Sequence, residues 1–68
     1  MNFIKRAGLK YLSRTIEKSL PHATDEELHL QWERVQLNIR DATDPEAEII
    51  YIGISGMISS EMVRRGLV

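Results

Sequence analysis

The sequence predicts an all-α fold, in which three helices form one bundle and the last two form an antiparallel hairpin. Apolar residues recur at three- and four-residue spacing along most of the chain, which is the period of one helix face. Residues that favour helix ends divide the chain into three segments. A chain of 68 residues is also short enough to form a single domain, residues 1–68.

The first helix is expected over residues 2–20. Its apolar residues share one broad arc of the helix and are Ile4, Gly8, Leu9, Tyr11, Leu12, Ile16 and Leu20. Pro21 disfavours the helical conformation at the residue before it, so this helix should end near Ser19 or Leu20.

The second helix is expected over residues 25–42. Thr24 followed by Glu27 is the signature of a capping box, and Asp25 complements the positive end of the helix dipole. A heptad-like apolar seam follows, formed by Leu28, Trp32, Val35, Ile39 and Ala42. Leu30 and Leu37 lie near the opposite side, and two apolar sides are typical of a helix packed between neighbours.

The third helix is expected over residues 45–65. Asp44 is a suitable N-cap, and Pro45 occupies the first helical position, where proline is favoured. Arg64 and Arg65 complement the negative end of the dipole, and Gly66 can adopt a left-handed cap. The connection to the second helix is about two residues long, which predicts the antiparallel hairpin.

The most apolar stretch, EIIYIGISGMISSEM at residues 48–62, lies inside this third segment. Its first half has strand-like composition, and a β-hairpin or short strand is the main alternative. The helical interpretation places Ala47, Ile50, Ile54, Ile58 and Met62 on one side, with Tyr51 and Met57 beside them. Ile49, Ile52 and Val63 form a second, narrower strip.

The glycines of this stretch do not form a known catalytic or phosphate-binding motif. Met57 replaces the second glycine of a nucleophile elbow, and the phosphate-loop pattern is absent. Gly53, Gly56 and Ser60 lie close together on a helix, where another helix could approach closely. Such contact would offset the helix cost of about 1 kcal/mol for each glycine. The contacting helix could belong to this chain, a second copy or a foreign target, and a kink at the glycines is the alternative.

A homodimer is expected, because so short a chain buries only about 60% of its unfolded surface and contains no cysteine for disulfides. Trp32 is either a core residue or an interface anchor. The residues expected to contact a second copy or another protein partner are Leu30, Trp32, Leu37, Ile49, Ile52, Gly53, Gly56, Ser60 and Val63.

The sequence contains no nucleophile–base pair, cysteine-rich metal site or cofactor loop, so neither catalysis nor a cofactor is expected. Glu26, His29 and Glu33 copy part of a di-iron ligand set. They lie off the apolar seam, and we expect them to form a solvated acidic face. His22 is expected to be a surface histidine.

Four basic residues at four-residue spacing follow the polar side of the first helix: Arg6, Lys10, Arg14 and Lys18. Nucleic acid, an acidic protein or an anionic membrane surface could bind such a face. A solvated face, or pairing with the acidic second and third helices, is the simpler interpretation.

Together these observations favour a small non-enzymatic regulator, adaptor or inhibitor that binds another protein. A nucleic-acid-binding regulator that uses the basic face is the first alternative, and a peripheral membrane-surface protein is the second. Residues 49–58 give about half of the roughly 20 apolar residues that a membrane span needs. No signal-peptide core is recognisable, and the lack of cysteine suits a reducing compartment, so we expect a cytoplasmic protein.

Overall fold

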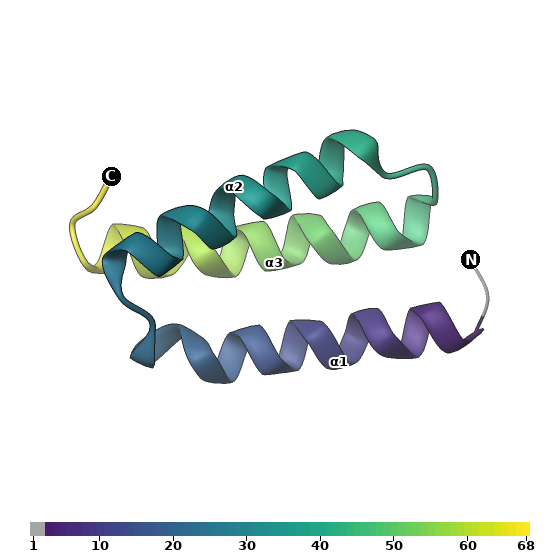
Figure 1. The fold of residues 1–68 in the computed structure, drawn as a ribbon, viewed down its shortest axis with the longest axis horizontal. Helices are drawn as coiled ribbons and strands as arrows, with labels where there is room; N and C mark the ends of the chain where they lie inside the picture. Colours follow the sequence, from purple (N-terminus) through teal and green to yellow (C-terminus); the bar gives the residue numbers. More distant parts are fainter. Residues whose placement is uncertain (1–2) are drawn as a thin grey trace.

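The computed structural model describes residues 3–68, with side chains from Gly8 onward, and consists of three helices packed together. Helix α1 spans Phe3–Ser19, a short 3-10 turn η1 spans Leu20–His22, α2 spans Asp25–Asp41 and α3 spans Pro45–Arg64 (Figure 1). The described part of the chain contains no strand. The all-α prediction is therefore confirmed, and the apolar stretch at residues 48–62 is helical throughout.

Helix α1 ends where the proline was expected to end it. The α-helical hydrogen-bonding pattern continues to Ser19, and Pro21 lies within the 3-10 turn that follows. A 3-10 turn tightens the chain at a helix end, and here it brings Leu20 and Ala23 into the core.

The start of α2 has the local structure that its sequence predicts. The backbone N–H of Glu27 donates to Thr24 Oγ1 at 3.1 Å, and the Thr24 N–H donates back to Glu27 Oε2 at 3.4 Å. This reciprocal pair is a capping box, which satisfies two donors that a helix start otherwise leaves without partners.

Both ends of α3 are also capped. Asp44 Oδ1 accepts the N–H of Glu46 at 2.9 Å, and Pro45 begins the helix. At the other end, Gly66 adopts a left-handed φ of 76°. The Leu67 N–H reaches the Met62 carbonyl at 2.9 Å, and the Gly66 N–H reaches the Val63 carbonyl at 3.0 Å. This pair of bonds is a Schellman motif, and it folds Leu67 back onto the core.

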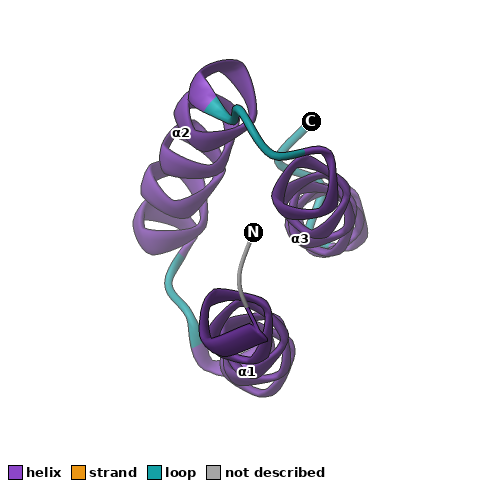
Figure 2. Ribbon diagram, turned by 90° about the vertical axis from the view of Figure 1, so that its right-hand side faces the viewer, coloured by secondary structure: helices purple, strands orange, loops and turns teal. Residues whose placement is uncertain are grey.

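Helix α3 is the element against which the other two pack. α2 and α1 each contact α3, and the contacts between α2 and α3 are the more extensive (Figure 2). The Gln36 amide of α2 also donates to Ser55 Oγ of α3 at 2.7 Å. Leu28, Ile54 and Ile58 are fully buried, and the other core residues between positions 8 and 68 are Leu20, Ala23, Val35 and Met62.

Not all of the predicted apolar sides are covered. Tyr11, which shares the apolar arc of α1, is 74% exposed, and its neighbour Leu12 is 41% exposed. Trp32 was interpreted as either a core residue or an interface anchor, and with an exposure of 38% it is one of the exposed large apolar residues and lies outside the core. The cause is geometric, because a helix that packs against one neighbour covers only one narrow side.

Candidate protein-interaction surfaces

The first candidate surface is the outer face of α3, which we define by Ile49, Ile52, Gly53, Gly56, Ser60 and Val63. All six residues are exposed, and the three large ones, Ile49, Ile52 and Val63, are exposed to 68%, 52% and 62%. No charged residue occurs from residue 49 to residue 60. The outer face of α3 is therefore an exposed apolar strip that no charge interrupts between Ile49 and Ser60.

The glycines on this face do not contact another helix of the chain. A Cβ atom added at Gly53 or at Gly56 would meet nothing within 4 Å. A hollow of about 630 Å³ instead separates the glycines from the end of α1 and from η1, whose Leu20 and Pro21 line its other side. Within the chain, the close contact that the glycine spacing suggested does not form. A second copy and a foreign target are the alternatives that remain.

The second candidate surface is the outer strip of α2, formed by Leu30 and Leu37, whereas Trp32 lies near the opposite side of the helix, on the seam with Leu28 and Val35. Leu30 and Leu37 are exposed to 54% and 49%. The spacing of seven residues places them in line, two turns apart. Exposed acidic residues, Glu26, Glu33 and Asp41, accompany this strip. The outer strip of α2 is thus apolar along its centre and acidic along its margin.

The third candidate surface is the basic face of α1. Lys10, Arg14 and Lys18 are exposed, and none of them forms an ion pair with another residue of the described chain. The side chain of Arg6 lies outside the described residues. The solvated-face interpretation agrees with this exposure, whereas pairing with the acidic helices of the same chain is not found for these three residues.

Arg65 joins three elements at one end of the molecule, and sequence analysis did not foresee this role. Its side chain is only 17% exposed. Nη1 donates to the Ala23 carbonyl at 2.7 Å and to Asp25 Oδ1 at 3.0 Å, and Nη2 donates to the Leu20 carbonyl at 2.9 Å. The Arg65 guanidinium therefore connects the end of α3 to η1 and to the start of α2. No local pattern in the sequence indicates contacts between residues 40 or more positions apart.

Glu61 completes this cluster from within α3. Its carboxylate accepts from Arg64 Nε at 2.9 Å and from Arg65 Nε at 2.7 Å. The hydrogen bonds from Arg64 and then Arg65 hold the pKa of Glu61 at about 2, below the usual 4.5. Since this perturbed carboxylate is engaged by two arginines at a helix end, the geometry assigns it to ion pairing within the fold.

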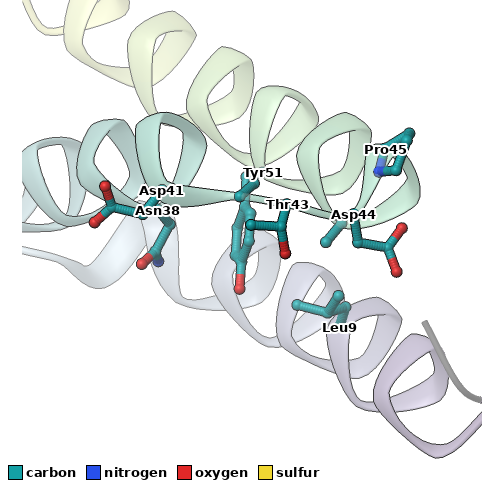
Figure 3. Close-up of a pocket in the computed structure, with 9 residues that line it drawn as sticks. Leu9, Asn38, Asp41, Thr43, Asp44, Pro45 and Tyr51 are labelled. Carbon is teal, nitrogen blue, oxygen red and sulfur yellow. The ribbon is translucent and has the colours of Figure 1, made fainter.

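An open hollow of about 820 Å³ lies at the other end of the molecule, beside the connection from α2 to α3. Leu9 and Tyr51 form its apolar part, and Asn38, Asp41 and Asp44 contribute polar groups. The Asp41 and Asp44 carboxylates point away from one another (Figure 3). The two carboxylates therefore do not converge on a shared ligand.

The remaining polar candidates lie apart on the surface. Glu26, His29 and Glu33 are exposed, as expected for a solvated acidic face, and His22 is exposed as well. Among the residues described from 3 to 68, no three histidine, aspartate or glutamate side chains are close enough to hold a metal ion. None of the described helices combines the length and the apolar character needed to cross a membrane.

Comparisons with known protein families, with curated proteins and with solved structures gave no match to this chain. Its function must therefore be inferred from the three surfaces themselves.

Proposed function

We propose that this chain is a small non-enzymatic interaction protein, a regulator, adaptor or inhibitor, that acts as a homodimer and binds another protein. In this proposal α2 and α3 form an antiparallel hairpin whose outer sides provide the contacts. The observation that carries the proposal is the exposure of large apolar side chains on both of these helices, Leu30 and Leu37 on α2 and Ile49, Ile52 and Val63 on α3.

The size of the core supports this proposal. Among residues 8–68, whose side chains the structure describes, seven are buried, and none of these seven is polar or charged. The radius of gyration is 12.1 Å, above the roughly 11 Å typical of a compact chain of this length. A small core of this kind provides only a small net free energy of folding. Burial of the exposed apolar strips in an interface would increase the stability of the folded chain.

The placement of the apolar residues also supports an interaction role. Single exposed apolar residues are normal on protein surfaces, whereas aligned groups of them mark interaction sites. Leu30 and Leu37 form one such line, and Ile49, Gly56 and Val63 form another at the same seven-residue spacing. The proposal of a non-catalytic role rests on the same surfaces together with the lack of a recognised catalytic motif.

The first test is to measure the oligomeric state by sedimentation equilibrium at micromolar concentration. A dimer is the expected result. A stable monomer would contradict the homodimer part of the proposal.

The second test is partner binding by the outer strip of α2. We expect the double variant Leu30→Asp/Leu37→Asp to lose a protein partner that the wild type retains from host lysate, with direct binding then measured on the purified partner. The matched control is His29→Asp/Asn38→Asp, which also introduces two aspartates at exposed positions of α2. Equal binding by both variants would contradict a role for the leucine strip.

The alternative function, nucleic-acid binding by α1, is favoured by one observation. Lys10, Arg14 and Lys18 are exposed and form no ion pair within the described chain. If this face binds a duplex, the affinity should fall steeply with salt, and Lys10→Glu/Arg14→Glu should abolish it. Absence of binding at low salt would exclude this alternative.

The second alternative, a peripheral membrane protein, is favoured by Tyr11, which is 74% exposed and follows Lys10 directly. An aromatic ring beside basic residues suits an anionic membrane surface. Flotation with anionic vesicles, with neutral vesicles as the control, tests this role. Recovery only in the unbound fraction would exclude it.

A further inference from the structure

We propose that the outer face of α3 binds a second copy of this chain, with the two α3 helices antiparallel and Gly56 at the twofold axis. This inference rests on the homodimer proposed above, and it specifies the face, the helix direction and the register of the contact. It leaves the outer strip of α2 free for a different protein.

The outer face of α3 is self-complementary about Gly56. Ile49 and Val63 each lie seven residues from Gly56, and seven residues are about two helical turns. In an antiparallel pair centred on Gly56, Ile49 of each copy therefore lies against Val63 of the other. Ile49 is 68% exposed and Val63 is 62% exposed in the single chain. These two apolar side chains would contact one another at both ends of the interface. A twofold interface requires this kind of match, because the same patch serves both subunits.

The centre of the face is suited to a close approach. Ile52 and Ser60 each lie four residues from Gly56, so a large residue of one copy would lie against a small residue of the other. A Cβ atom at Gly56 would meet no atom within 4 Å in the single chain. The glycines therefore leave room for the side chain of Ile52 from a second copy. Helix axes come closest where the contacting side chains are small.

The distribution of charge selects the antiparallel direction. Glu46 and Glu48 lie in the first turn of α3, Arg64 lies in its last turn, and the face between them is uncharged. An antiparallel pair places each acidic end beside the arginine end of the other copy, and it also aligns the helix dipoles favourably. A parallel pair would place like charges together.

The positions of these charges around the helix agree with the same arrangement. Glu46 and Arg64 are 18 residues apart, which is about five full turns, so both lie on the same side of α3. A twofold axis perpendicular to the helices brings that side of one copy beside the same side of the other. The Arg64 side chain is 67% exposed although it bonds Glu61, so its guanidinium remains accessible to the acidic end of a second helix.

The outer strip of α2 differs from the outer face of α3 because it carries a charged residue near its centre. Glu33 lies between Leu30 and Leu37 in the sequence, and the first turn of α2 carries Asp25, Glu26 and Glu27. Two such strips facing one another would bring acidic side chains together near the centre of the contact. The charge pattern thus favours α3 for pairing with a second copy.

Cysteine cross-linking tests the register directly, because the chain has no cysteine of its own. We expect Ile49→Cys and Val63→Cys, mixed and oxidised mildly, to form a disulfide-linked heterodimer. Neither variant should cross-link alone, because residue 49 of one copy lies roughly 21 Å from residue 49 of the other along the helix axes. A disulfide needs Cα atoms within about 7 Å. Leu30→Cys is the control on α2 and should not cross-link.

Sedimentation equilibrium of two aspartate variants tests the face independently. Ile52→Asp should weaken dimerisation more than tenfold, because the carboxylate would be buried without a partner. Leu37→Asp, at a similarly exposed position of α2, should leave the dimer intact. Both positions are about half exposed in the single chain, so circular dichroism should show that both variants fold.

The outcomes separate this inference from the function on which it rests. A wild-type monomer would contradict the homodimer and this inference together. A wild-type dimer in which Ile49→Cys cross-links with itself would contradict the antiparallel direction alone. A dimer that Leu37→Asp dissociates and Ile52→Asp does not would contradict the choice of α3, with the homodimer retained.

Discussion

The two faces of α3 have similar composition and opposite environments. The inner face presents Ile54 and Ile58, which are fully buried, and Met62, which is nearly so. The outer face presents Ile49, Ile52 and Val63, each more than half exposed. Isoleucine occurs on both faces, so residue type alone does not distinguish the core from the surface of this helix.

The two faces differ in what they contact within a single chain. The inner face is accounted for by the packing of α1 and α2 against α3. The outer face gains nothing from the fold of one chain, and its glycines cost helix stability without a compensating contact. The contact with a second copy proposed above would give the outer face a physical role.

The largest expected effect comes from truncating matched isoleucines on the two faces. Ile54→Ala should reduce the free energy of unfolding by about 2–5 kcal/mol, because it removes buried methyl groups and leaves a cavity. Ile52→Ala should change the unfolding of the monomer by less than about 1 kcal/mol. Urea denaturation at concentrations where the chain is monomeric compares them. Equal losses of unfolding free energy in the two variants would show that the inner and outer faces of α3 contribute equally to the stability of the monomer.

The neighbouring residues Arg64 and Arg65 extend the same comparison to the end of α3. Arg65→Met should lower the urea midpoint clearly more than Arg64→Met, because the Arg65 side chain donates to the carbonyls of Leu20 and Ala23 and the Arg64 side chain does not. The urea midpoint of Arg65→Lys should lie between those of Arg65→Met and Arg64→Met, since an ammonium group keeps the charge but lacks the planar set of donors of a guanidinium. An identical midpoint for Arg64→Met and Arg65→Met would show that these long-range bonds do not stabilise the fold.

The glycines allow a test in the opposite direction. In the monomer, Gly53→Ala and Gly56→Ala should each raise the free energy of unfolding by about 0.5–1 kcal/mol, because alanine favours the helix and its Cβ meets open space. The same Gly56→Ala variant should weaken dimerisation, which sedimentation measures. Loss of stability in the monomer would instead indicate a close contact within the chain.

The smallest effect concerns pH. The pKa of Glu61 is about 2 in the folded chain, below its usual 4.5, because Arg64 and Arg65 bond the carboxylate. Its contribution to stability is therefore fully present above pH 4.5 and is lost as the pH falls toward 2. Glu61→Gln should flatten the stability profile in this window, and the exposed Glu33→Gln should not. Thermal unfolding from pH 2 to pH 6 measures the difference.

The helix ends were predictable because each depends on a few adjacent residues. The Thr24–Glu27 capping box, the Asp44–Pro45 start and the left-handed Gly66 all form as their local sequence indicates. Backbone hydrogen bonding at a helix end is satisfied within one turn, so no knowledge of the rest of the fold is needed.

The candidate surfaces were only partly predictable. The six residues of the outer face of α3 and the leucines of α2 were identified from periodicity, and all of them are exposed. The sequence did not decide whether Trp32 is a core residue or an interface anchor. Trp32 lies on the same heptad-like seam as Leu28 and Val35, and those two residues are buried. Periodicity gives the direction of a side chain, whereas the position of the neighbouring helix decides whether that direction is covered.

The three helices, their caps and the apolar residues that line α3 were predictable from the amino-acid sequence, because these features follow from local hydrogen bonding and from the helical period. The open environment of the α3 glycines and the hydrogen bonds from Arg65 to Leu20, Ala23 and Asp25 result from the packing of the helices. Both features depend on the relative positions of segments that are distant in the sequence, and no local pattern specifies these positions.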